Sequence, residues 1–203
     1  AEYVGHLALI NRFLGQIAET GNPIFWEHAV SRGVLKTDGR RIDEYFRPPY
    51  RWLIDQMRSR IPSYRDGYPV WAYPESKPDL RSPQFSRGVQ GVRVEFVANT
   101  EDILLSDMGV WDYALSGHYF GCSEAEVVEF EGDNPFYSVW RNSESDPDRT
   151  ARIMKSWEAM FELDMLRKLA TSNPEWHSTP FLQATLGKVT LDQVTKVTPF
   201  TSR

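Results

Sequence analysis

Four short stretches between residues 68 and 111 hold most of the unusual features of this chain. They read YPVWAY at 68–73, KPDLR at 77–81, GVRVEFV at 91–97 and LLSDMGVW at 104–111. Short runs of β-branched and aromatic residues bounded by proline or glycine are typical of β-strands, so strands are predicted at 70–73, 91–97 and 103–105. The charged residues among these strands exceed what an apolar core needs. A functional site is therefore expected in this region.

The stretch 91–97 alternates between apolar and charged residues. Its apolar residues should face one side of a strand, and Arg93 and Glu95 should face the other side together. A solvent-facing or cross-strand ion pair explains such a pattern. The alternative is that this face lines a cleft, where Arg93 binds an anionic ligand and Glu95 acts on a proton.

Ser106 and Asp107 stand where the apolar strand gives way to a helical pattern that extends to about Tyr119. An aspartate at this position is typical of a helix N-cap, because its carboxylate accepts a backbone N–H of the first turn. The helix is expected to bury Trp111 and Tyr113. The alternative role for Asp107 is proton transfer in a site that Trp111 helps to line.

The remaining periodicity predicts helices over 2–19, 23–32, 48–60 and 148–171, and strands over 181–189 and up to Phe200. A capping box of Ser123 and Glu126 predicts one more short helix. The acidic, turn-rich stretch 131–149 is expected to be a mobile loop, and 74–90 an ordered excursion. Together these elements predict an α+β fold: residues 23–203 form a single domain with a small mixed or antiparallel sheet and several packed helices, and residues 1–22 form a helical extension.

Composition excludes several classes of protein. The formal net charge of −5 argues against a large nucleic-acid footprint. No apolar run approaches the length of a membrane span, so no membrane contact and a cytoplasmic location are expected. The single Cys122 cannot form an intramolecular disulfide, and the four histidines show no metal-ligand spacing, so no metal is predicted. Aromatic residues make up 13% of the chain, which permits an aromatic-lined pocket or a homodimer contact.

Standard catalytic motifs are missing. Pro78-Asp79 and Glu95 have the outline of a metal-dependent nuclease, but Val97 stands where the essential lysine would be. The sequence contains neither a phosphate-binding glycine loop nor a G-x-S-x-G elbow. These absences argue against a nuclease, a phosphate-loop protein and a serine hydrolase.

The order of the pieces resembles a bacterial family known as domain of unknown function 3841. The resemblance rests on the following segments: 25–27, 32–35, Tyr50 with Trp52, 69–73, 77–81, 91–96, 104–107 with Trp111, 156–157, Phe161, 183–185, and Val194, Val197 and Phe200. This family implies no activity.

A looser outline similarity links the two ends of the chain to ADP-ribosyltransferase-like folds. In those folds a late strand presents a glutamate to the ribose of NAD, and Gln183 stands at the nearest position here. The similarity implies a transferase and makes NAD the cofactor to test. An amide is not a general base, so Glu95 or another acid would have to serve.

These observations define one candidate site and two classes of function. In an enzyme acting on a nucleotide-like or other anionic small molecule, Trp71 and Trp111 would stack on a ring. Asp79, Arg81 and Arg93 would hold the charged part of the ligand, and the catalytic candidates are Glu95, Asp107 and Gln183. The alternative is a non-catalytic ligand- or partner-binding protein, for example a defence or toxin–antitoxin component. A buried structural network of the same charges is a third interpretation.

Overall fold

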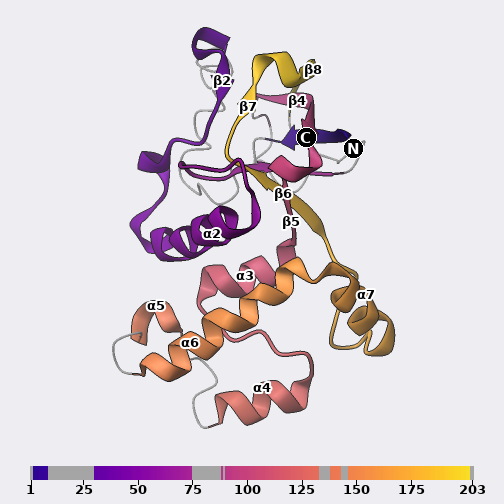
Figure 1. Ribbon diagram of the computed structural model, residues 1–203. Coiled ribbons are helices and arrows are strands. Elements are labelled where there is room, and N and C mark those ends of the chain that lie inside the picture. The colour runs from indigo at the N-terminus through magenta and orange to yellow at the C-terminus, as the bar shows by residue number, and fades with distance from the viewer. Residues whose placement is uncertain are drawn as a thin grey trace. The chain divides into compact units, whose positions relative to one another are not determined.

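The chain divides into two compact units, and it passes from the first unit to the second and back again. The computed structural model describes residues 2–8, 30–74, 88, 90–132, 138–142 and 146–201 (Figure 1). The first unit comprises Ala1–Leu104 and Gln183–Arg203, and the second comprises Leu105–Leu182. Strands concentrate in the first unit and helices in the second, so the expected α+β class is confirmed.

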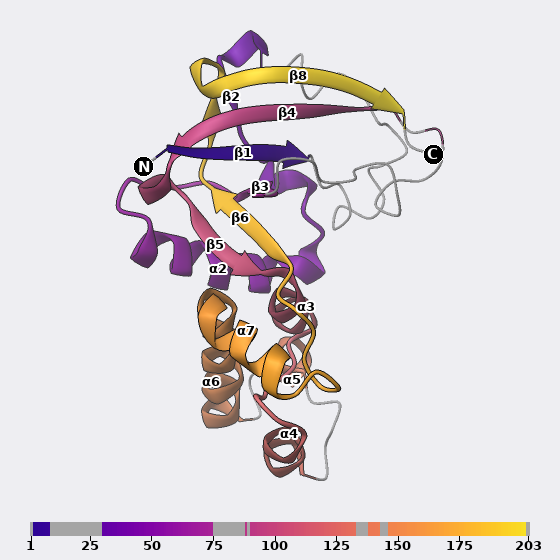
Figure 2. The ribbon, with the colours of Figure 1, turned by 90° about the vertical axis from the view of Figure 1, so that its right-hand side faces the viewer.

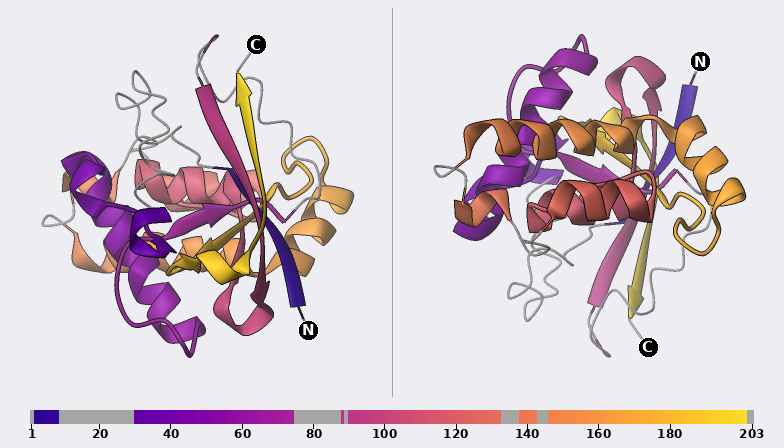
Figure 3. Two further views of the ribbon diagram at one scale, coloured as in Figure 1. Left: turned by 90° about the horizontal axis from the view of Figure 1, so that it is seen from above. Right: turned by 90° about the horizontal axis from the view of Figure 1, so that it is seen from below.

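A three-stranded antiparallel sheet organises the first unit. Strand β4 (Gln90–Asn99) lies between β1 (Glu2–Ala8) and β8 (Val194–Thr201), as Figure 2 and, from above, Figure 3 (left) show. The predicted alternation along β4 is confirmed, because Val94 and Phe96 are fully buried on one face. Arg93 and Glu95 therefore lie on the opposite, polar face of β4.

Strand β1 corrects the helix expected over 2–19. Residues 2–8 pair along their whole length with β4, from Glu2 opposite Asn99 to Ala8 opposite Arg93. A glycine in a helix interior costs about 1 kcal/mol relative to alanine, and Gly5 interrupts the apolar stripe. Pairing with a long neighbouring strand outweighs a weak local preference for helix. Residues 9–19 lie outside the described part of the chain.

Two smaller sheets accompany the three-stranded one. One has the strand order β3 (Val70–Ala72), β6 (Leu182–Leu186) and β5 (Leu104–Asp107), and the other pairs β2 (Val34–Leu35) with β7 (Val189–Thr190). Strand β3 confirms the strand predicted at 70–73, β5 extends two residues beyond the one predicted at 103–105, and the single strand predicted over 181–189 is divided between β6 and β7.

Helix α2 (Arg47–Arg60) also confirms its prediction. Prolines occupy its first turn, where their missing N–H groups have no intrahelical partner, and its apolar face is buried. The end of the earlier predicted helix is confirmed at Gly33, which has a φ of +70°. Residues 23–29 of that helix lie outside the description.

Helices and one 3₁₀ turn build the second unit. In chain order they are α3 (Met108–Ser116), α4 (Glu124–Glu131), α5 (Val139–Asn142), α6 (Pro147–Ser156), the 3₁₀ turn Trp157–Phe161, and α7 (Leu163–Ser172). Figure 3 (right) shows them from below. Helix α3 begins at its predicted cap, but it ends at Ser116 rather than near Tyr119, and Tyr113 is exposed rather than buried.

The long helix expected over 148–171 is broken in two. Helix α6 ends at Ser156 and the chain tightens into the 3₁₀ turn before α7 begins. The reason is long-range: the buried Trp157 indole donates a hydrogen bond to the backbone carbonyl of His118 at 2.7 Å, and the Phe120 N–H donates to the Ser156 hydroxyl at 3.0 Å. A continuous apolar period in the sequence does not reveal such contacts.

The acidic stretch 131–149 also departs from the expected mobile loop. In its described part, residues 139–142 form a helical turn and helix α6 begins at Pro147. Val139 is fully buried and the Ser138 hydroxyl donates to the carbonyl oxygen of Ser116 at 2.8 Å. Arg149 also donates to the carbonyl oxygen of Glu131 at 3.2 Å, so both apolar and charged side chains hold the described part in place.

Candidate functional site

The structure brings Arg93 and Glu95 together on the polar face of β4. A guanidinium nitrogen of Arg93 lies 3.2 Å from a carboxylate oxygen of Glu95, and the two side chains are only 27% and 19% exposed. Lys196 on β8 places its ammonium 3.8 Å from the same oxygen. The ion pair predicted from the alternation is present, and its sheltered position leaves the ligand-binding interpretation open.

Trp71 and Gln183 occupy the neighbouring sheet of the first unit. The Trp71 ring meets the Tyr50 ring edge-on, with centroids 6.4 Å apart. Burial raises the pKa of Tyr50 to about 12. A hydrogen bond with the Trp71 side chain acts in the opposite direction and lowers this pKa by a smaller amount. Gln183 is 2% exposed, and its amide nitrogen has no hydrogen-bond partner among the described residues. Trp71 stands opposite Thr185, two residues from Gln183, so these side chains share one face.

Asp107 and Trp111 belong to the second unit. One carboxylate oxygen of Asp107 accepts the N–H of Val110 and the other accepts the N–H of Phe181, each at 2.8 Å. The expected N-cap is therefore confirmed. Burial raises the pKa of Asp107, opposed by these backbone hydrogen bonds. Trp111 is fully buried. Proton transfer by Asp107 and stacking by Trp111 stay predictions, and Asp79 and Arg81 lie outside the described residues.

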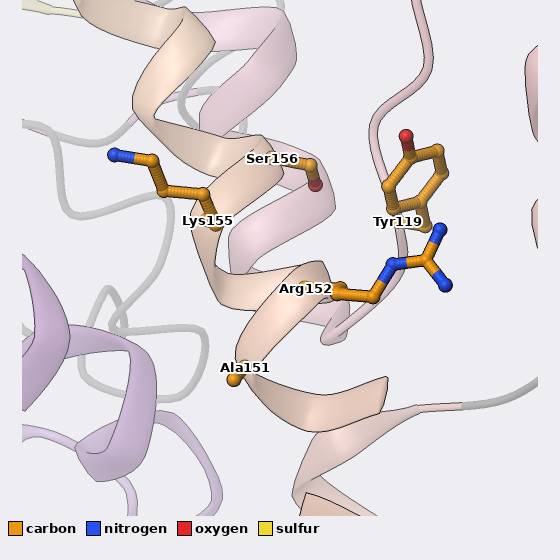
Figure 4. Close-up of a pocket in the computed structure, with 5 residues that line it drawn as sticks. All are labelled: Tyr119, Ala151, Arg152, Lys155 and Ser156. Carbon is orange, nitrogen blue, oxygen red and sulfur yellow. The ribbon is translucent and has the colours of Figure 1, made fainter. Parts of the chain in front are cut away.

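An open pocket of about 440 Å³ lies on the surface of α6 in the second unit. Its described lining consists of Tyr119, Ala151, Arg152, Lys155 and Ser156 (Figure 4). Four of these residues lie on α6, where Ala151 with Lys155 and Arg152 with Ser156 stand four positions apart, the spacing that brings side chains onto the same side of a helix. In Figure 4 the Arg152 guanidinium lies beside the Tyr119 ring, whereas Lys155 projects from the opposite side of α6. Ala151, on the same side of α6 as Lys155, adds a small side chain to the lining.

Tyr119 forms the aromatic wall of this pocket, and contacts with Phe130 and Glu126 fix its position. Its ring stacks on Phe130 with centroids 3.9 Å apart and planes inclined by 13°. Its hydroxyl donates to Glu126, whose other carboxylate oxygen accepts the N–H of Cys122 at 2.9 Å. Burial, together with the hydrogen bond to Glu126, raises the pKa of Tyr119 to about 12. The wall is therefore a neutral, fixed phenol ring.

The two cations of the pocket differ in what they contact. The guanidinium carbon of Arg152 lies 4.8 Å from the centre of the Phe130 ring, and no carboxylate within the described ranges forms an ion pair with it. Lys155 pairs with Glu158 at 2.8 Å. A guanidinium over an aromatic ring keeps its planar hydrogen-bond donors available to a phosphate or carboxylate. The arrangement can bind an anion beside an aromatic ring.

Sequence reasoning missed this pocket. The available signal was the three cations Arg149, Arg152 and Lys155, spaced three residues apart at the end of an acidic stretch. Nothing in the sequence connects them with Tyr119, which precedes α6 in a segment without regular structure.

Neither a metal-binding cluster nor a membrane-spanning helix is found among the described residues. No group of three or more histidine, cysteine, aspartate or glutamate residues there is placed to hold a metal ion. Within the same residues, no helix has both the length and the apolar character that a membrane crossing requires.

The fold and the pocket define an α+β protein whose helical unit carries an aromatic and basic surface site. Residues 13–195 match the family described as "Domain of unknown function (DUF3841)", and the chain belongs to this family. The resemblance noted from the sequence is thereby confirmed. No curated protein and no solved structure matches the chain. The similarity to ADP-ribosyltransferase-like folds stays a prediction.

Proposed function

We propose that this protein binds an anionic small molecule that carries an aromatic ring, such as a nucleotide, in the pocket on α6. The observation that supports the proposal is the placement of the Arg152 guanidinium beside the Tyr119 ring, without an ion pair to any described carboxylate. Arginine binds phosphate and carboxylate oxygens through paired N–H donors, and aromatic walls with a few polar groups are typical of ligand pockets.

The geometry also suggests how the ligand lies. Its ring would pack against Tyr119, and its first anionic group would bind Arg152. A longer polyanionic tail would cross the open surface above Ala151 towards Lys155, which projects from the other side of the helix. The Ser156 hydroxyl donates to the Ile153 carbonyl at 2.7 Å and accepts the Phe120 N–H, so it contributes a fixed polar surface rather than a free donor.

Isothermal titration calorimetry with adenosine, AMP, ATP, NAD and inorganic phosphate tests the proposal. AMP should bind more tightly than adenosine or phosphate alone, because it engages both the wall and the guanidinium. Arg152→Ala should weaken AMP binding by about tenfold to a hundredfold, the effect of losing hydrogen bonds to a charged group. The advantage of ATP over AMP should disappear in Lys155→Ala.

Two further variants separate the pocket from general charge and folding effects. Ala151→Leu fills the open surface without changing charge and should block binding. Arg167→Ala removes an exposed arginine of α7, which pairs with Asp164 at 2.7 Å, and should bind like the wild type. Unchanged affinity in both Arg152→Ala and Ala151→Leu, or no heat with any compound at millimolar concentration, would contradict the proposal.

The proposal concerns binding, because the carboxylate at the aromatic wall is already engaged. Glu126 accepts hydrogen bonds from Tyr119 and Cys122. A transferase that uses NAD is the finer proposal that the sequence similarity suggests. Release of nicotinamide from NAD by the wild-type protein would support it, and NAD binding without release would favour the non-catalytic alternative.

A further inference from the structure

We infer that the polar face of β4 and β8 holds a small oxyanion, a carboxylate or phosphate group, between Arg93 and Thr198. This site belongs to the first unit, whereas the α6 pocket belongs to the second. It therefore stands independently of the proposed function.

The strand register places the two residues side by side. Arg93 stands directly opposite Thr198, and Glu95 directly opposite Lys196, in the antiparallel pairing of β4 with β8. Residues opposite each other in such a pair point to the same face of the sheet. The positions of the two strands can be followed in Figure 2.

Two hydrogen-bonding groups on this face are buried without partners. The Nε–H group of Arg93 and the Oγ1 hydroxyl of Thr198 are both shielded from solvent, and neither has a hydrogen-bond partner among the described residues. A buried polar group without a partner costs free energy, so most such groups in folded proteins are satisfied by protein, water or a bound ion. Two adjacent donors can be satisfied together by a group that offers two acceptor oxygens.

The charge on this face favours an anion over a neutral acceptor. Arg93 lies 3.2 Å and Lys196 lies 3.8 Å from the same oxygen of Glu95. Two cations of the described residues thus approach one carboxylate, and their positive charge favours an anion beside the two donors. An oxyanion would accept from the Arg93 Nε–H and the Thr198 hydroxyl and offset that charge.

Thermal unfolding in phosphate, acetate and chloride at matched ionic strength tests the inference. The wild-type melting temperature should rise saturably with phosphate or acetate beyond the chloride value, because a ligand stabilises the state that binds it. The oxyanion that acts at the lower concentration identifies which group the site prefers. Thr198→Val and Arg93→Lys each remove one donor and should weaken the apparent affinity by about tenfold or more.

Thr198→Val also reports on the state without the anion. Because its hydroxyl has no partner, the variant should melt in chloride at the wild-type temperature or above it. Thr195→Val is the matched control: Thr195 is exposed and donates to the Glu95 carbonyl at 3.2 Å, so the variant should keep the oxyanion response. Arg152→Ala should keep it as well, which separates this site from the α6 pocket.

Three results would overturn the inference. The first is the absence of any saturable response in the wild type. The second is an equal response in Thr198→Val, which would show a general salt effect on exposed surface. The third is a lower melting temperature of Thr198→Val in chloride, which would show that the hydroxyl is already satisfied.

Discussion

The carboxylate of Asp107 accepts the backbone N–H of Phe181 at 2.8 Å, across 74 positions of sequence. The same side chain caps α3 through the N–H of Val110, and it is only 6% exposed. One residue thus ends a strand, begins a helix and holds the segment that leads into β6. These two backbone hydrogen bonds offset the cost of burying the carboxylate.

Asp107→Ala should lower the free energy of unfolding by about 1–3 kcal/mol, because two backbone N–H groups lose their acceptor. Urea unfolding measures the loss. Asp43→Ala is the matched control, since Asp43 caps an exposed 3₁₀ turn through the N–H of Tyr45 at 2.9 Å. An equal loss in the two variants would show that the tie to Phe181 adds nothing to the cap.

The stability contributed by Asp107 should depend on pH. Burial raises the pKa of this carboxyl in the folded state, so the folded protein binds its proton more readily than the unfolded chain does. This contribution is fully present below the unfolded pKa of about 3.9 and is lost as pH rises through the raised folded value. The stability of the wild type relative to Asp107→Asn should therefore increase as pH falls through that range. A relative stability that decreases on acidification would contradict the raised pKa.

Substitutions at Gly33 and Gly117 distinguish the cost of backbone strain from the cost of a steric clash. Gly33 has a φ of +70° with open space around an added Cβ, whereas Gly117 has a φ of +73° and a Cβ there would lie 2.6 Å from both Ser138 and Trp140. Gly33→Ala should cost about 1 kcal/mol from the left-handed backbone alone. Gly117→Ala should cost about 2–4 kcal/mol, since overpacking adds to the same strain. Equal losses in thermal or urea unfolding would show that the neighbours of Gly117 move aside.

Tyr50 should ionise late in an alkaline titration. Burial raises its pKa from 10.0 to about 12, so the stability that the protonated phenol contributes is lost as pH rises through this interval. Ultraviolet absorbance should show tyrosinate forming near the upper value, with a smaller amplitude in Tyr50→Phe. Tyr45→Phe removes the hydroxyl of an exposed tyrosine and should keep that late component. A late component of unchanged amplitude in Tyr50→Phe would assign it to other tyrosines, such as Tyr119.

Local patterns in the sequence were enough to place many elements and both helix caps. Alternation identified β4 and the shared face of Arg93 and Glu95, and the capping residues Asp107 and Ser123 begin α3 and α4 as predicted. These features depend on neighbours only a few residues away, so their physical cause is present in the sequence itself. The ordered set of short motifs likewise identified the family.

Only the tertiary structure decided the rest, because the partners lie far apart in the chain. Pairing with β4 makes residues 2–8 a strand, and the contact of Trp157 with His118 breaks the predicted long helix. The α6 pocket needs Tyr119 beside Arg152, and the unpartnered donors of Arg93 and Thr198 become visible only once the strand register is known. Local propensity carries information on caps and periods, but long-range packing determines which polar groups are buried and which remain available to a ligand.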